Sequence, residues 1–262
     1  MGFGISHRGR IAAILFAAAF GAVTVARAGQ EGGPAPVALP HVARLLGQGA
    51  PLVIIAFGSS STEGVGATSR ATTYPSRLQT ELRAALPARS SVNVLNRGVG
   101  GEDADDMMRR LPKIIAELPG LVIWQTGSND PLKGVPLERF IRETRRGIEA
   151  MRRAGIDVML MEPQDCRVLQ AVSGSLLYRD AIRSLGAEFG VPVIRRFDLM
   201  REWRIGRTLT EAHLMSPDAL HMTDGGYALL ARAVSDQILV ASGRVPAVPG
   251  ALVAAKDAAQ RL

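Results

Sequence analysis

Residues 52–64, LVIIAFGSSSTEG, decide the fold class, because an unbroken apolar run ends abruptly in a cluster of small polar residues. Four further apolar runs follow along the chain. They lack strict alternation between polar and apolar residues, which is typical of strands covered on both faces. Stretches with helical spacing of apolar residues separate them. The predicted strands are 52–57, 92–96, 121–126, 157–161 and 191–194, and the predicted helices include 74–86, 137–154, 176–189 and 225–240.

This alternation predicts an α/β fold with right-handed crossovers, in which helices cover both faces of a parallel sheet. We expect a three-layer α/β/α sandwich around a five-stranded, flavodoxin-like sheet. In such sheets the functional groups gather beyond the carboxyl ends of the strands. Residues that directly follow the apolar runs are therefore the candidates for a site.

The composition agrees with one large globular domain. Of the 262 residues, 47% are hydrophobic and 21% charged, which excludes a mainly disordered chain. The one cysteine, Cys166, rules out an intramolecular disulfide and a thiolate metal cluster. The formal net charge of +7 falls to +4 without the three arginines of residues 1–28, a segment that has no acid. So mild a charge does not favour nucleic-acid binding.

The chain divides into four predicted segments. Residues 1–28 combine a basic start, an apolar run at 11–25 and the sequence Ala26-Arg27-Ala28, which together indicate a secretory signal peptide cleaved after Ala28. An uncleaved membrane anchor is the alternative. A flexible leader (29–40), a folded domain (41–242) and a loosely ordered tail (243–262) follow. We expect export to the periplasm or the medium, with no stable membrane insertion after cleavage, because no later apolar run reaches ~20 residues.

A histidine with a nearby carboxylate points to nucleophilic catalysis. Beyond the signal segment, the histidines are His41, His213 and His221, and only His221 has a carboxylate, Asp218, one helical turn away. Such a carboxylate can hold the ring Nδ1–H while Nε2 faces a serine. The serine run after the first strand is less decisive: Gly58-x-Ser60 begins like the nucleophile elbow of α/β-hydrolases, but Thr62 stands where that motif requires glycine. A phosphate cradle or a dinucleotide-binding loop is the alternative, but the spacing that either motif requires is absent.

Four polar clusters, taken in order, resemble the conserved blocks of the SGNH/GDSL hydrolases. The first, FGSSST at 57–62, makes Ser60 the nucleophile, although Ser59 stands where that family usually has aspartate. The second and third, NRGVGG at 96–101 and GSND at 127–130, imply that Gly101 lends its backbone N–H and Asn129 its side-chain amide. The last, DALH at 218–221, supplies acid and base.

The resemblance implies a serine hydrolase that needs neither cofactor nor metal. The N–H groups of Ser60 and Gly101 and the Asn129 amide would form an oxyanion hole, and Asp218 and His221 would complete the triad. We expect an exported esterase acting on short acyl esters, especially acetyl groups, carried by a small molecule or a polymer. An acyltransferase using the same residues and a catalytically inactive carbohydrate-binding domain are the alternatives. The oligomeric state stays open.

Overall fold

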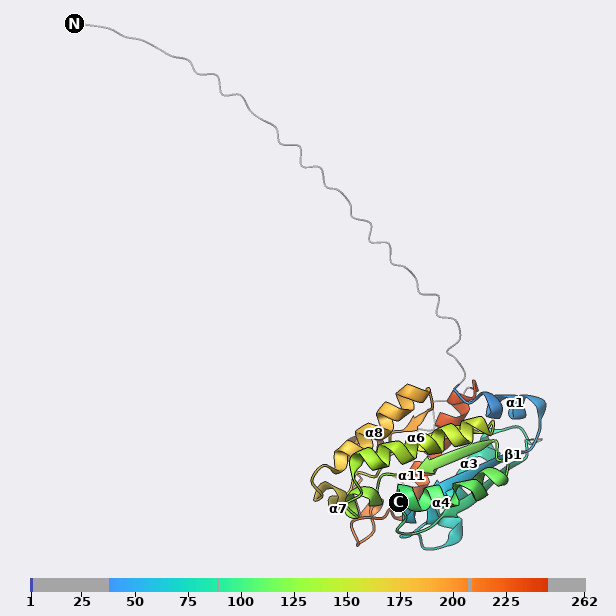
Figure 1. The fold of residues 1–262 in the computed structure, drawn as a ribbon, viewed down its shortest axis with the longest axis horizontal. Coiled ribbons are helices and arrows are strands. Elements are labelled where there is room, and N and C mark those ends of the chain that lie inside the picture. Colours follow the sequence, from blue (N-terminus) through green and yellow to red (C-terminus); the bar gives the residue numbers. More distant parts are fainter. Residues whose placement is uncertain (2–37, 89, 207–208, 245–262) are drawn as a thin grey trace, which may run out of the picture. The chain divides into compact units, whose positions relative to one another are not determined.

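Five parallel strands form a single sheet in the order β2-β1-β3-β4-β5 (Figure 1). The structure, a computed structural model, describes residues 38–88, 90–206 and 209–244 together with Met1. The predicted signal peptide, most of the leader and nearly all of the tail therefore lie outside the described residues. The strands are β1 (Leu52–Gly58), β2 (Val92–Gly98), β3 (Leu121–Gln125), β4 (Asp157–Met161) and β5 (Val193–Ile194).

Helices cover both faces of this sheet, so the predicted three-layer α/β/α sandwich is confirmed (Figure 1). On one face lie α1 (Pro40–Gln48), α3 (Tyr74–Ala85), α9 (Arg196–Gly206) and α11 (Asp224–Ala241). On the other lie α4 (Ala104–Ala116), α6 (Leu137–Arg153) and α8 (Ser175–Phe189). Short helices follow three of the strands: α2 (Ser60–Glu63), α5 (Asn129–Leu132) and α7 (Arg167–Gln170). A further short helix, α10 (Glu211–Leu214), lies between α9 and α11.

Successive side chains of β1 enter different cores, which explains why the run lacks alternation. Ile54 and Ala56 pack against the α3 and α11 layer, whereas Ile55 and Phe57 pack against the α4 and α6 layer. Both layers exclude water from the strand, so both faces require apolar residues. Phe57 also stacks on Trp124 of β3, with ring centroids 5.9 Å apart.

Four strands differ from the predicted bounds by one or two residues; β1 continues one residue further, to Gly58, and β3 ends one residue earlier, at Gln125. β2 continues to Gly98, where it pairs with Gly58 at the end of β1. β5 begins only at Val193, because Pro192 has no N–H for the ladder. The core also begins slightly before the predicted residue 41, since Leu39 is fully buried and Pro40 starts α1.

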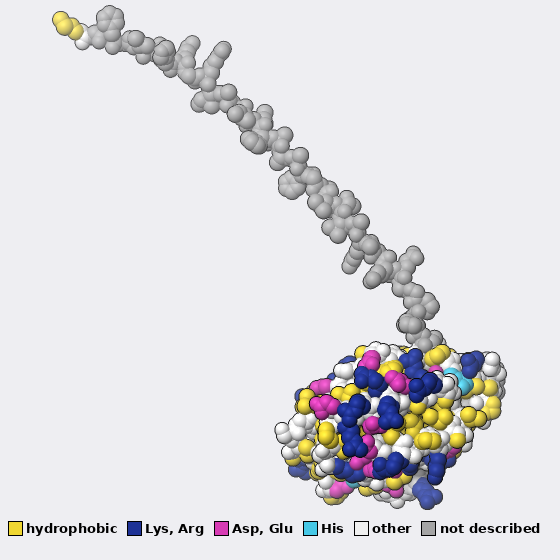
Figure 2. All heavy atoms as spheres, in the orientation of Figure 1, with side chains coloured by type: hydrophobic (Ala, Val, Ile, Leu, Met, Phe, Trp, Pro, Cys, Tyr) yellow, Lys and Arg dark blue, Asp and Glu magenta, His cyan; other side chains and the backbone are white. Residues whose placement is uncertain are grey.

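The surface carries charges of both signs. Over the face shown in Figure 2, basic and acidic side chains are interspersed rather than separated into large fields of one sign. Within the described residues, no helix has the length and apolar character that crossing a membrane requires.

Candidate active site

Ser60 stands directly beyond the carboxyl end of β1, as the first residue of α2. The turn is tight: a Cβ placed on Gly98 would come within 2.1 Å of the Glu63 backbone nitrogen. Glycine at the end of β2 therefore lets two backbones meet beside the serine. Ser60 itself is partly exposed to solvent.

His221 and Asp218 lie next to Ser60, although 161 positions separate the serine from the histidine. His221 Nε2 is 2.8 Å from Ser60 Oγ, and His221 Nδ1 is 2.6 Å from Asp218 Oδ2. These two contacts form one continuous line from carboxylate to ring to hydroxyl. In this arrangement the ring can take a proton from the serine while the carboxylate orients it.

The Asp218–His221 segment is a tight turn, and not the helical turn that the spacing suggested. Ala219 has a φ of 55°, in the left-handed region, and an antiparallel bridge between Met215 and Met222 closes the loop. This turn aims the N–H groups of Leu220 and His221 at Asp218 Oδ1, each at 2.9 Å. The same short spacing thus brings acid and base together through backbone hydrogen bonds.

These donors keep the Asp218 carboxylate ionised. Partial burial pushes its pKa upward, but hydrogen bonds from His221, from the Leu220 backbone and from the Ser216 hydroxyl together hold the pKa well below its usual range. Ser216 Oγ donates to Asp218 Oδ1 over 2.9 Å. Sequence reasoning missed Ser216, because a serine two residues before an aspartate carries no distinctive signal.

The three predicted oxyanion-hole donors follow three neighbouring strands, β1, β2 and β3. Within the described part of the chain, the backbone N–H groups of Ser60 and Gly101 donate to no protein acceptor. Gly101 has a φ of 76°, and a Cβ there would meet nothing within 4 Å, so this backbone is open to an approaching ligand. Asn129 begins α5 after β3, and its Nδ2 donates one hydrogen to the Glu102 carbonyl at 2.7 Å. This is the one hydrogen bond that its Nδ2 donates within the described residues.

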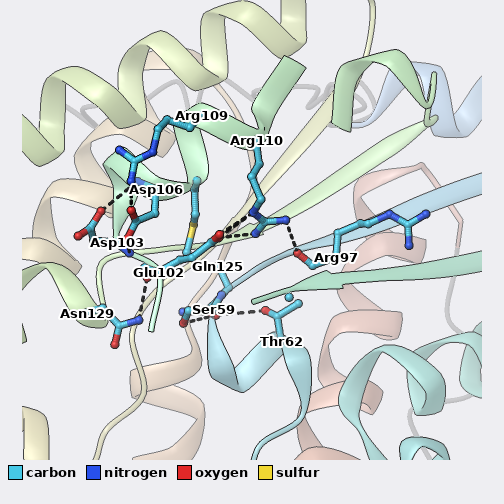
Figure 3. A network of polar contacts seen from close by, with 12 residues as sticks. Ser59, Thr62, Arg97, Glu102, Asp103, Asp106, Arg109, Arg110, Gln125 and Asn129 are labelled. Atoms are coloured by element: carbon cyan, nitrogen blue, oxygen red, sulfur yellow. Dashed lines mark hydrogen bonds and ion pairs between the residues drawn. The ribbon is translucent and has the colours of Figure 1, made fainter. Parts of the chain in front are cut away.

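An ion pair supports the Gly101 loop (Figure 3). Arg110 Nε donates to both Glu102 carboxylate oxygens, at 2.7 and 2.9 Å. Its NH1 donates to the Arg97 carbonyl at 3.1 Å, and its guanidinium lies 4.9 Å from the centroid of the Phe57 ring. Lys133 pairs with Asp103 and Asp106 as well. The acidic run at 102–106 therefore serves in ion pairs that stabilise this part of the fold.

The other nucleophile and base candidates lie apart from this line. His41 Nδ1 contacts the Gly155 carbonyl at 2.8 Å, and His213 Nδ1 contacts Thr210 Oγ1 at 2.7 Å. Cys166 is buried, and burial raises the pKa of its thiol, which disfavours the reactive thiolate.

Comparison with known families settles the class of the protein. The model of the non-GDSL lipase-like family matches residues 26–242. The chain belongs to this family. It is thus an SGNH/GDSL-like hydrolase, a serine hydrolase of the carboxylic ester hydrolase type, as the resemblance implied. Non-GDSL in the family's name agrees with Ser59 standing in place of the usual aspartate. No curated protein matches the chain.

Solved structures share the fold. A lipolytic protein of the G-D-S-L family from Desulfitobacterium hafniense has 22% identity and a TM-score of 0.59, covering 70% of this chain and 97% of that one. The acetylxylan esterase Axe2 from Geobacillus stearothermophilus has 20% identity and a TM-score of 0.60, covering 76% and 97%. A two-domain esterase active on acetylated mannans has 16% identity and a TM-score of 0.65, covering 80% of this chain and 55% of its own length.

Proposed function

We propose that this lipase-like protein is an exported esterase that removes short acyl groups, above all acetyl groups, from a carbohydrate. The observation that carries the proposal is the continuous line from Asp218 through His221 to Ser60 Oγ. Ser60 attacks the ester carbonyl, and His221 takes the serine proton and passes it to the leaving alcohol. Water, deprotonated by His221, then releases the acid and regenerates Ser60.

The donors around Ser60 serve the charge that forms during this reaction. Attack places negative charge on the carbonyl oxygen, where fixed donors lower the barrier most effectively. In the proposed mechanism, the N–H groups of Ser60 and Gly101 and the free N–H of Asn129 bind that oxygen. Neutral donors suffice here, so no step of the proposal requires a metal or a cofactor.

The openness of the site favours a short acyl group and a polar alcohol. The Asp218 side chain is 45% exposed, so water reaches the carboxylate end of the triad. Each CH₂ of a longer acyl chain would need an apolar wall to gain ~0.8 kcal/mol. Two structural neighbours are an acetylxylan esterase and an esterase active on acetylated mannans, which supports an acetylated carbohydrate as the substrate.

A fluorophosphonate probe tests the nucleophile. We expect one covalent adduct at Ser60, lost in Ser60→Ala together with ester hydrolysis. Ser173→Ala, at an exposed serine on a loop, is the control and should keep both. Labelling that persists at Ser59 or Ser61 in Ser60→Ala would contradict the assignment.

A series of p-nitrophenyl esters tests the acyl group. We expect kcat/KM to peak between acetate and butyrate and to fall by octanoate, with acetate released from acetylated xylan or mannan. A rise through octanoate would instead indicate a lipase or thioesterase. Transfer of acetyl to an added sugar at the expense of hydrolysis would identify an acyltransferase.

Export is tested on the protein's own N-terminus. The proposal expects mature protein to begin at Gly29, after cleavage behind Ala28. N-terminal sequencing of protein from the periplasm or the medium checks this. Exported protein that still begins at Met1 would contradict it.

A further inference from the structure

A buried chain of hydrogen bonds connects the turn that carries Ser60 to the loop that carries His221. Ser60 follows β1 and His221 precedes α11, so the sheet alone does not set their separation. On the outer side, Thr68 N donates to Asp224 Oδ1 at 2.9 Å and ties the two segments together. On the inner side the connection runs through side chains that follow β3 and β4.

The hydrogen-bond chain begins at Gln125, the last residue of β3, whose side chain is fully buried. Its Oε1 accepts three hydrogen bonds, from Ser59 N at 2.9 Å, Ser59 Oγ at 3.1 Å and Thr62 Oγ1 at 3.1 Å (Figure 3). These donors lie on both sides of Ser60 in the sequence. One amide oxygen therefore holds the whole nucleophile turn against the neighbouring strand.

The chain continues through two more buried residues. Gln125 Nε2 donates to Ser128 Oγ at 3.2 Å, and the Ser128 hydroxyl donates to Gln164 Oε1 at 3.1 Å. Gln164 Nε2 then donates to the carbonyl of Leu220 at 2.9 Å. Leu220 directly precedes His221, so the chain ends on the backbone that positions the base.

Only one orientation of these groups satisfies every donor. Since Gln125 Oε1 takes three donors, its NH₂ must face Ser128, whose hydroxyl must then donate onward. Gln164 Oε1 receives that proton and a second one from Arg196 NH2 at 2.6 Å, so its own NH₂ must face Leu220. Turning over either amide would set donor against donor in a dry interior, which costs far more than at a surface.

We propose that Gln125, Ser128 and Gln164 are positioning residues whose hydrogen-bond chain sets the separation of Ser60 and His221. The proposal rests on the proposed role of those two residues. The side chains of Gln125, Ser128 and Gln164 are uncharged, so they hold the nucleophile turn without adding a negative charge near the oxygen that becomes negative during attack. Ser59, which stands in place of the family's aspartate, contributes two of the donors that this neutral acceptor binds.

Single and double substitutions within the chain test the proposal. Ser128→Ala removes one oxygen from the middle, and Gln164→Leu removes the link to Leu220. We expect each to lower kcat for p-nitrophenyl acetate by about 10- to 100-fold with KM changed less than about threefold, because a small displacement of a reacting group slows the chemical step more than binding. The rate of fluorophosphonate labelling should fall in parallel. The double variant should be no slower than the worse single variant, as expected for links of one chain.

Two control variants each remove one hydrogen bond away from the Ser60 and His221 site. Ser242→Ala removes a buried hydroxyl that donates to the Leu239 carbonyl at 3.0 Å. Gln237→Leu removes an Nε2 that donates to the Val193 carbonyl at 3.0 Å, at the start of β5. Both lie toward the opposite edge of the sheet. We expect similar losses in Tm but a kcat within about twofold of the parent.

The outcomes separate this proposal from the proposed function. If Ser60→Ala abolishes turnover while Ser128→Ala and Gln164→Leu keep the parent's kcat, the positioning role is wrong and the esterase stands. If the kcat losses of the two single variants multiply in the double variant, they arise from independent packing effects, and the positioning role is wrong as well. If Ser60→Ala keeps full activity, the proposed function itself fails.

Discussion

At the scale of single residues, the Asp218 carboxylate accepts hydrogen bonds from several protein donors. Oδ1 accepts from Ser216, Leu220 and His221, and Oδ2 accepts from the His221 ring. Because these donors hold the pKa of Asp218 low, the carboxylate stays ionised at any pH used for assay. The negative charge that it places beside His221 is therefore constant over that range.

Asp218→Asn tests that orienting role. We expect the variant to fold normally, because an amide oxygen can still accept from the backbone donors. The rate should fall by ~10⁴, the loss measured for the same change in the best-studied triad. Steady-state kinetics beside circular dichroism checks both expectations. An unchanged kcat would mean that His221 is oriented by a different group.

Asn129→Ala removes a donor that the transition state uses. We expect kcat to fall by ~10²–10³ with little change in KM, as for a single oxyanion-hole donor. The substitution also deletes the bond from Nδ2 to the Glu102 carbonyl. Asn129→Ala is compared with Glu102→Gln, which keeps the backbone carbonyl of residue 102 and the Asn129 amide. A loss in KM alone for Asn129→Ala would place the amide in substrate binding instead.

Asp130, the neighbour of Asn129, makes stability depend on pH. Burial, aided by the nearby Asp103 charge, raises the pKa of Asp130 to about 6. The native protein therefore takes up a proton near pH 6 that the unfolded chain takes up only near pH ~4. The contribution of Asp130 to stability rises as pH falls from above 6 toward 4, and ionisation destabilises the native state above 6.

Asp130→Asn should remove this dependence. Asn keeps an oxygen for the Ala104 N–H, which Asp130 Oδ1 accepts at 3.0 Å. We expect the variant to be more stable than the parent by about 1–2 kcal/mol at pH 8, with the gain vanishing near pH 4.5. Urea denaturation at several pH values measures it. Parallel pH curves for the two proteins would refute the assignment.

At the scale of elements, Arg110 of α4 connects the segment before its own helix with two strands, β2 and β1. It pairs with Glu102 before the helix, bonds the Arg97 carbonyl at the end of β2 and lies over Phe57 of β1. Only 26% of its side chain and 13% of that of Glu102 are exposed, so the pair is much drier than an ordinary surface ion pair. This arrangement holds the Gly101 loop against the sheet.

Arg110→Met measures the contribution of that pair. Methionine keeps much of the apolar contact with Phe57 but leaves Glu102 without its partner. We expect a loss of about 1–3 kcal/mol in the free energy of unfolding, between the values for exposed and fully buried pairs. Arg109→Met, at a side chain that is 71% exposed, should change stability by less than about 0.5 kcal/mol. Equal losses in the two variants would contradict this difference.

At the scale of the whole molecule, the fold begins before the first strand. Leu39, Val42 and Leu46 are buried in the core that also contains α3 and α11. The Val42 N–H donates to Asp157 Oδ2 at 2.9 Å, which ties α1 to the start of β4. The first strand and its crossovers therefore depend on a helix that precedes them.

Two truncations test this boundary. A chain that begins at Gly29, as export would produce, should keep the Tm of the full chain. A chain that begins at Gly49 loses α1 together with Leu39 before it, and the side chains of Leu39, Val42 and Leu46 are each worth about 1.5–3 kcal/mol when buried. After the entropy regained by the shorter chain, we expect a net loss of several kcal/mol and a Tm lower by about 10 °C. An unchanged Tm for the second truncation would show that α1 contributes nothing to stability.

The layers of this protein and the places where chemistry can occur are predictable from local patterns in the chain. Five apolar runs without alternation required cover on both faces, and the residues behind them, Ser60, Gly101 and Asn129, came to one edge because parallel strands end there together. The Asp218 and His221 pair was visible because three positions separate the two residues. Periodicity and spacing are local properties, so they can be read without knowing which segments meet.

Only the tertiary structure decided how the parts of the site are held. The left-handed turn at Ala219, the donor Ser216, and the amides of Gln125 and Gln164 left no mark in the local pattern. A polar residue at the end of an apolar run can lie in solvent or bind a distant segment, and Gln125 finds its partners 63 and 66 positions away. Whether a buried amide is satisfied depends on which backbones pack beside it, and that packing exists only once the chain has folded.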